Sequence, residues 1–137
     1  MGLRLDGPMD QQEAEQLNPL QLAYIGDVVW ELVIRDHLIH RKLNVHHMHR
    51  DCIALVNAGA QAEAFRAVLP SLTEVEAEIA RRGRNAHAKH PAPNHQRPED
   101  YAAATGFEAL MGYLYLTRQE ERILELARMI TGGDSNG

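Results

Sequence analysis

Apolar residues recur at helical spacing along most of this chain, and the longest such run begins at Asn18. Asparagine caps helices well, and Pro19 is tolerated in the first helical position because its missing N–H would have no partner there. The spacing predicts one long, mostly buried helix that ends near Ile39. Gly26 in its interior costs about 1 kcal/mol relative to alanine, which indicates that another backbone passes close by. The apolar positions of this helix are Leu22, Ile25, Val29, Leu32 and Val33.

The next apolar run extends from Val45 to Val68 in helical register. It predicts one long helix, or two helices with a bend near Gly59. Pro70 ends the run. The sequence Thr73-Glu74-Val75-Glu76 then has the Thr-x-x-Glu form of a capping box, so a new helix is expected to begin there.

This new helix is expected to open into the one substantial loop of the chain, from Arg82 to Pro98, because Gly83 and several prolines interrupt regular structure. Helical spacing returns from Glu99 to Leu116 and from Gln119 to Ile130. No alternation of apolar and polar residues is long enough to predict a strand, and no internal repeat is found. The predicted fold class is therefore all-α.

The length of 137 residues suits one domain with an apolar core and is short for two. We expect a single domain over 1–137, with an ordered core at 17–131 and a flexible tail at 132–137. The single cysteine, Cys52, has no partner for an internal disulfide and is expected to be a buried thiol. No segment has the roughly 20 consecutive apolar residues that cross a bilayer, and residues 1–16 lack the apolar block of a signal peptide, so a cytoplasmic location is expected.

Positive charge is distributed unevenly along the chain. The net charge of -5 argues against indiscriminate nucleic-acid binding. From Ile79 to Pro98, however, there is no Asp or Glu, while 5 of the 14 Lys and Arg and three histidines fall inside. A charge run by itself is typical of a solvated loop, but the histidines make this one readier to accept a polyanion. The basic residues are Arg81, Arg82, Arg84, Lys89 and Arg97.

Two carboxylates are embedded in apolar helical sequence. Asp27 follows Ile25-Gly26, and Glu108 follows Gly106-Phe107. A carboxylate in such surroundings is costly unless something pairs with it. Each acid is close to a glycine that lets backbones approach, so the two acids could meet across a helix pair and hold a hard cation such as Mg²⁺. A metal held in this way would activate water and stabilise charge on a scissile phosphate.

Spacing alone favours a plainer alternative, in which each acid pairs with a nearby arginine such as Arg35 or faces solvent. Glu31 lies one turn after Asp27 and one turn before Arg35. A surface ion pair between Glu31 and Arg35 is its favoured role, and support of a metal bound by Asp27 is the alternative.

Two motifs resemble those of ribonuclease III enzymes. The segment Leu22-Ala23-Tyr24-Ile25-Gly26-Asp27-Val28-Val29 is similar to the family's signature helix, Leu-Glu-Phe-Leu-Gly-Asp-Ala. The segment from Thr105 to Leu116 resembles its second motif, Asp-x-x-Glu-Ala-Leu-Ile-Gly-Ala. Arg81-Arg82-Gly83-Arg84-Asn85-Ala86 is similar to a basic stretch of the Mini-III branch, a bacterial group that consists of the catalytic domain only. The resemblance extends from Asn18 to Leu116.

The resemblance implies an all-α ribonuclease III-like bundle in which Asp27 and Glu108 are the catalytic, metal-binding carboxylates. The implied cofactor is Mg²⁺, with Mn²⁺ as the alternative. Ala23 and Thr105 stand where the general pattern has Glu and Asp. The site therefore has fewer acids to hold cations, which argues against a second metal ion in the absence of substrate.

The resemblance also implies a homodimer whose two sites each cut one strand of double-stranded RNA and leave 5′-phosphate and 3′-hydroxyl ends. For the Mini-III branch the implied substrate is the precursor of 23S ribosomal RNA. The chain has no room for the separate RNA-binding domain of larger relatives, so the catalytic domain itself must bind the duplex through its phosphates and 2′-hydroxyls. Arginine suits phosphate because its planar fork donates two hydrogen bonds. We assign this contact to Arg81, Arg82, Arg84, Lys89 and Arg97.

Two other readings stay open from the sequence. A non-catalytic RNA-binding or ribosome-associated module on the same fold is suggested by Ala23 and Thr105, although the presence of both Asp27 and Glu108 weighs against it. A helical metal phosphohydrolase acting on small phosphates is suggested by a group of histidines. Such an enzyme would need a His-Asp doublet that this sequence lacks, and histidines grouped on a polar face are more often solvated. These histidines are His37, His40, His46, His47 and His49.

Overall fold

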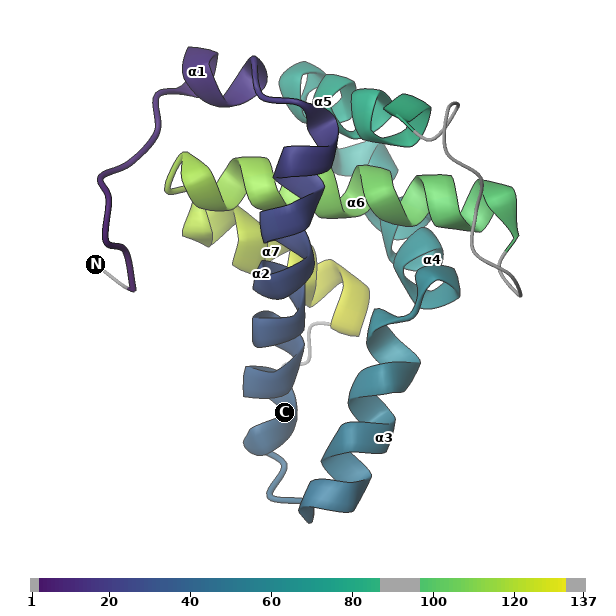
Figure 1. The fold of residues 1–137 in the computed structure, drawn as a ribbon. Coiled ribbons are helices and arrows are strands. Elements are labelled where there is room, and N and C mark those ends of the chain that lie inside the picture. Colours follow the sequence, from purple (N-terminus) through teal and green to yellow (C-terminus); the bar gives the residue numbers. More distant parts are fainter. Residues whose placement is uncertain (1–2, 87–96, 133–137) are drawn as a thin grey trace.

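The computed structural model describes residues 3–86 and 97–132, and every regular element within these ranges is a helix (Figure 1). The prediction of an all-α fold is confirmed. The elements are α1 (Gln11–Glu15), α2 (Pro19–Ile39), α3 (Val45–Val56), α4 (Ala58–Val68), a short 3₁₀ turn η1 (Leu69–Ser71), α5 (Glu74–Asn85), α6 (Pro98–Leu116) and α7 (Glu120–Thr131).

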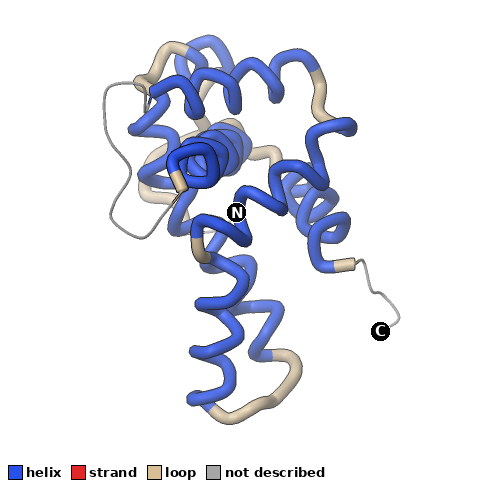
Figure 2. The backbone as a smooth tube through the Cα atoms, turned by 90° about the vertical axis from the view of Figure 1, so that its right-hand side faces the viewer, coloured by secondary structure: helices blue, strands red, loops and turns tan. Residues whose placement is uncertain are grey.

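Helix α6 is the centre of the molecule. In Figure 2 it is seen end-on, with the other helices packed around it, while α2 and α3 extend away from the body as a hairpin. Every residue from Ala103 to Leu114 is buried except Glu108, which is partly exposed. Between Ala103 and Leu114, the central helix is therefore accessible to solvent only at Glu108.

Two glycines set the crossing of α2 over α6. A Cβ atom on Gly26 would overlap the backbone carbonyl oxygen of Glu108, and one on Gly112 would overlap that of Leu22. Only glycine allows the two backbones to approach so closely. The close approach predicted at Gly26 is thus confirmed.

A second pair of glycines joins α5 to α6. A Cβ atom on Gly83 would lie 2.9 Å from the Cα of Gly106, and one on Gly106 would lie 2.6 Å from the carbonyl oxygen of Ala80. The predicted loop from Arg82 was wrong in its first residues, because α5 continues through Gly83 to Asn85. The close packing that Gly83 permits offsets its poor helix propensity. The rest of the predicted loop, residues 87–96, lies outside the described residues.

The run from Val45 to Val68 forms two helices, which is the second of the two predicted alternatives, and the break is at Asn57, two residues before Gly59. Asn57 has extended backbone angles (φ -69°, ψ 165°) and serves both helices. Its Nδ2 donates to the carbonyl oxygen of Ile53 at 3.1 Å, and its Oδ1 accepts from the N–H of Ala60 at 2.8 Å. An asparagine cap replaces the helical hydrogen bonds that the bend removes.

The helix starts follow the predicted capping chemistry. Asn18 caps α2 with Pro19 in the first turn, and Thr73 and Glu76 form the predicted capping box of α5. Cys52 is buried, as predicted. Helix α1 was not predicted, because its five residues contain a single apolar side chain, Ala14. Within the described ranges, no helix combines the length and apolar character needed to span a bilayer.

Candidate active site

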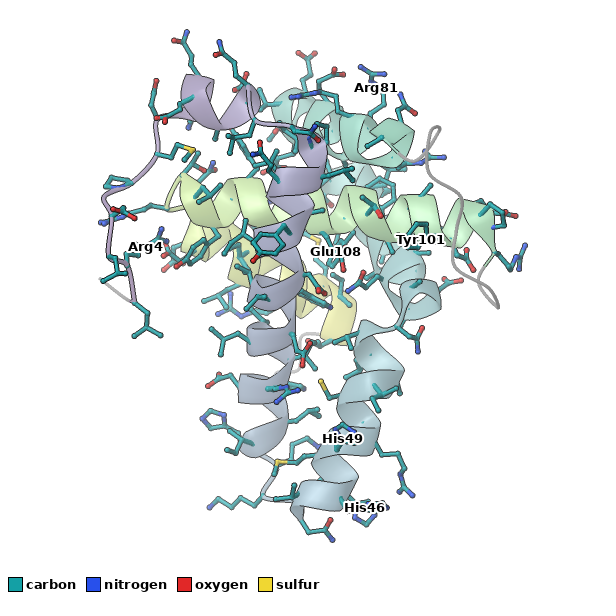
Figure 3. All side chains as sticks on the ribbon, in the orientation of Figure 1. Arg4, His46, His49, Arg81, Tyr101 and Glu108 are labelled. Atoms are coloured by element: carbon teal, nitrogen blue, oxygen red, sulfur yellow. The ribbon has the colours of Figure 1, made fainter. Side chains whose placement is uncertain are left out.

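Asp27 and Glu108, 81 positions apart in the sequence, come together where α2 crosses α6. The contact of Gly26 with the backbone of Glu108 brings the next residue of α2, Asp27, to the Glu108 side chain. Figure 3 shows Glu108 between α2 and α4. The two carboxyl groups are within hydrogen-bonding reach of each other. The convergence of the two acids expected from the sequence is present in the structure.

The surroundings of Glu108 strongly favour its protonated form. Burial raises the pKa of its carboxyl group from 4.5 to about 8, and the hydrogen bond and negative charge of Asp27 act in the same direction. Asp27 itself is exposed. A cation bound between the two acids would favour the ionised form of Glu108, so metal binding would release its proton.

Gln61 is a third member of the site that the sequence analysis overlooked. It lies in the first turns of α4, is 2 % exposed, and forms a side-chain hydrogen bond with Glu108 that opposes the rise in pKa. A signal for it was present: Gln61, Phe65 and Val68 fall at i, i+4 and i+7, which makes Gln61 the one polar residue on the buried stripe of α4.

The donor set suits a hard divalent cation. The carboxylates of Asp27 and Glu108 offer oxygen ligands, which Mg²⁺ and Mn²⁺ prefer, and Mg²⁺ is commonly held by one or two carboxylates plus water and substrate phosphate. Ala23 is buried, and the Thr105 hydroxyl donates to the carbonyl oxygen of Tyr101 at 3.0 Å. Among the described residues, no group of three or more His, Cys, Asp and Glu is arranged to hold a metal. The two acids would therefore hold the cation with few other protein ligands.

Glu31 and Arg35 form the predicted ion pair on α2. Arg35 is thus paired with Glu31, and it is Gln61, an uncharged residue, that contacts Glu108. The pairing of Asp27 or Glu108 with Arg35, which spacing alone allowed, is not what the structure shows.

The predicted RNA-binding residues have different surroundings. Arg81 is exposed and pairs with Glu78 through two hydrogen bonds of 2.9 and 2.6 Å, whereas Arg97 is exposed and lies 3.3 Å from Glu99. Arg84 is exposed on α5, and Lys89 lies outside the described residues.

Arg82 differs from the other basic residues because it is only partly exposed. Its guanidinium donates to the backbone carbonyl oxygens of Glu15 at 2.5 Å and Leu17 at 3.1 Å. These two bonds tie α5 to the end of α1 and to the segment before α2, which gives Arg82 a structural function that is separate from the predicted contact with RNA.

The histidines lie far from the carboxylates, towards the end of the α2–α3 hairpin. His46 and His49 are labelled there in Figure 3, and both are exposed. His37, His40 and His47 are exposed as well. Their solvated positions match the plainer interpretation of this group.

An apolar stripe on α2 is exposed beside the site. Tyr24, Val28 and Leu32 recur at i, i+4 and i+8 and are 82 %, 62 % and 60 % exposed. Large apolar side chains in a row on a helix surface commonly mark a protein interface.

Comparisons with known proteins agree on one family. The model of the ribonuclease III domain matches residues 20–119. The chain is 48 % identical over 111 residues to a Mini-ribonuclease 3 of Symbiobacterium thermophilum, covering 80 % of this chain and 85 % of that protein. It is 45 % identical over 120 residues to a Mini-ribonuclease 3 of Enterococcus faecalis, covering 84 % and 89 %. A crystal structure of a Fusobacterium nucleatum protein superposes with a TM-score of 0.79 at 29 % identity, covering 86 % of this chain and 94 % of the other.

Proposed function

The chain belongs to the ribonuclease III family, in its Mini-ribonuclease 3 branch, and is an endoribonuclease; from this premise we propose that Asp27 and Glu108 are its catalytic carboxylates and hold Mg²⁺. The observation that carries the proposal is the contact of these two acids at the crossing of α2 and α6, in the one opening of the buried stretch of α6. The proposal treats the whole chain as a single endonuclease domain.

Members of this family depend on divalent metal ions. A bound cation supplies an activated water and stabilises negative charge on the phosphate under attack. The part of the protein is to present the two carboxylates at a fixed separation, which the glycine contact between α2 and α6 does. Without a cation, the raised pKa of Glu108 favours its protonated form, which limits the repulsion between two adjacent carboxyl groups.

The family acts on double-stranded RNA. We propose that this enzyme cuts duplex RNA to leave 5′-phosphate and 3′-hydroxyl ends, and that its natural substrate is the precursor of 23S ribosomal RNA in the cytoplasm. Phosphate contact would come from Arg81, Arg84, Lys89 and Arg97, with a smaller share from Arg82. Arg81 and Arg82 line a hollow of about 470 Å³ between the end of α5 and the start of α2, where a phosphate group has room.

A homodimer is part of this proposal. The exposed stripe of Tyr24, Val28 and Leu32 lies on the same helix as Asp27. Two copies that packed through these stripes would bury the apolar side chains and bring their active sites to one duplex. Each site would then cut one strand.

The proposal is tested by incubating the protein with a long RNA duplex and Mg²⁺. We expect Asp27→Asn and Glu108→Gln each to reduce the cleavage rate by at least about 100-fold, since a metal ion contributes several kcal/mol and each 1.4 kcal/mol changes a rate tenfold. Circular dichroism should show that both variants stay folded. Cleavage at the wild-type rate by either variant would remove that residue from the site.

The alternative of a non-catalytic RNA-binding module is distinguished in the same experiment. It predicts duplex binding without Mg²⁺-dependent cleavage by the wild-type protein. The chemistry of the site argues for the enzyme, because a binding module has no need of two adjacent acids at the one opening of the buried stretch of α6.

A further inference from the structure

The side chain of Gln61 is the one polar group on the buried face of α4, and it is directed at the catalytic pair. It is 2 % exposed, and its partner is the carboxyl group of Glu108. An uncharged amide buried among apolar side chains is costly unless it is hydrogen-bonded, and leucine would fill a similar volume without that cost. A glutamine at this position is explained by the hydrogen bond that it makes with Glu108.

Glu108 is held from two sides. Asp27 approaches it from α2, and Gln61 approaches it from α4. A carboxylate with a single neighbour would be free to rotate about its side-chain bonds, whereas a donor on one oxygen leaves the other in a defined direction. The backbone of Glu108 cannot shift to compensate, since its carbonyl oxygen lies against Gly26.

The position of Gln61 is itself fixed by the bend between α3 and α4. Asn57 caps α4, and its carbonyl oxygen accepts from the N–H of Gln61 at 2.9 Å. Phe65 and Val68, further along the same stripe, are 5 % and 0 % exposed and anchor α4 against the core. The amide therefore approaches Glu108 from a rigid element.

We propose that Gln61 is a positioning residue of the active site: its side-chain amide donates a hydrogen bond to one carboxylate oxygen of Glu108 and directs the other towards Asp27 and the metal ion. The inference rests on the proposed function, since it assigns Gln61 to the metal site formed by those two acids. Its consequence is that Gln61 determines how tightly the enzyme holds its metal, with little effect on the binding of RNA.

The test measures Mn²⁺ binding without RNA, by electron paramagnetic resonance of the free ion, in wild type, Gln61→Leu and Val68→Ala. Gln61→Leu removes the donor but keeps a side chain of similar size, and we expect it to weaken Mn²⁺ affinity by about tenfold, as for other residues that orient metal ligands. Val68→Ala is the matched control, because it creates a buried defect on the same helix two turns further on. It should bind Mn²⁺ as the wild type does even if its melting temperature falls.

Cleavage kinetics provide a second readout. Gln61→Leu should need about ten times more Mg²⁺ for half-maximal activity, should recover most of its kcat at high Mg²⁺, and should keep the wild-type KM for duplex RNA. If Gln61→Leu does not fold, Gln61→Glu replaces it in the Mn²⁺ measurement. A third carboxylate beside Glu108 should tighten Mn²⁺ binding several-fold.

The outcomes separate this inference from the proposed function. Wild-type Mn²⁺ affinity in Gln61→Leu, or in Gln61→Glu where the leucine variant does not fold, would overturn the role of Gln61 while leaving the carboxylate pair in place. If the wild type binds no Mn²⁺, or if Asp27→Asn does not abolish that binding, the proposed metal site is wrong. The inference about Gln61 is then wrong as well.

Discussion

The Cα of Gly26 lies against the backbone carbonyl of Glu108, so a single helix contact both joins α2 to α6 and places Asp27 beside the second acid. At the next contact along the crossing, a Cβ atom on Gly112 would likewise overlap the carbonyl oxygen of Leu22. Because the residue after Gly26 is Asp27, any change in the spacing of the two helices also changes the separation of the carboxylates.

Gly26→Ala should lower both stability and activity. The added methyl group would overlap a backbone atom, so the helices must separate, and we expect a loss of at least about 2 kcal/mol in the free energy of unfolding. Gly59→Ala is the matched control, since its Cβ would meet only Asn57 Oδ1 at 3.4 Å. It should stabilise α4 by about 0.5–1 kcal/mol. Urea denaturation compares the two variants, and equal stabilities would contradict the close contact.

The metal-free protein should lose stability as the pH rises. Glu108 has its pKa raised to about 8 in the folded state, mainly by burial, against 4.5 when exposed. The stabilisation from its bound proton is complete below pH 4.5 and is lost as the pH rises through about 8. In Glu108→Gln this dependence should disappear, and at pH 8 without metal the variant should melt at a higher temperature than the wild type. Thermal melts at several pH values in EDTA measure this, and parallel curves would contradict it.

Arg84 and Arg82 should respond differently to substitution by alanine. Arg84→Ala should weaken duplex binding and reduce by about 1 the slope of log affinity against log salt. Arg82→Ala should mainly destabilise the fold, by about 1.5–3 kcal/mol, because its guanidinium bonds the carbonyl oxygens of Glu15 and Leu17. Arg128→Ala, which removes an exposed charge on α7, is the control for general electrostatics. Binding titrations and urea denaturation separate these effects, and an Arg84→Ala variant with wild-type binding would exclude that contact.

Leu32→Asp should convert a dimer into a monomer, because it introduces a charge into the exposed apolar stripe of α2. Val75→Asp places the same charge at a similarly apolar, exposed position on α5 and should leave the oligomeric state unchanged. Gel filtration coupled to light scattering measures the mass of each. A wild-type protein that is monomeric at micromolar concentration would contradict the proposed two-strand mechanism.

The ion pair between Glu76 and Arg122 should stabilise the fold above acid pH. Although burial acts to raise the pKa of Glu76, hydrogen bonds from Arg122 and Thr73 lower it overall from 4.5, and the pair is short at 2.8 Å. Arg122→Met leaves the carboxylate buried without its partner and should cost about 3 kcal/mol at pH 7. The contribution is present above pH 4.5 and is lost as the pH falls through the lowered pKa, so the two proteins should converge in acid. Urea denaturation from pH 7 to pH 3 checks this, and a constant difference would refute the link.

Most helix boundaries could be predicted because they depend on local chemistry. Asn18 and Thr73 mark helix starts by capping, and the structure has them there. Helix α6 begins at Pro98, one residue before the predicted Glu99. The continuation of α5 through Gly83 depends on tertiary packing against α6, which overrides the poor helix propensity of glycine. The break at Asn57 has a local cause, since the Asn57 side chain caps α4.

Asp27 and Glu108 could be predicted from the sequence because a carboxylate in an apolar helix costs free energy unless it has a partner. Gln61 gives a weaker signal, since its place on the apolar stripe of α4 marks it as buried but does not show which group it faces. Its role depends on how α4 packs on α6, and this packing is set by residues far from it in the sequence.

The position of Glu108 in the most enclosed helix has a consequence for how the enzyme fails. Local opening in proteins begins at frayed ends and exposed segments, and the hairpin of α2 and α3 is of that kind here, while α6 has neighbours on nearly every side. The tip of the hairpin can therefore open and close locally without moving Glu108. Heat that is sufficient to displace Glu108 must first unfold the helices packed around α6, so Glu108 should leave its position only when the native structure as a whole is lost.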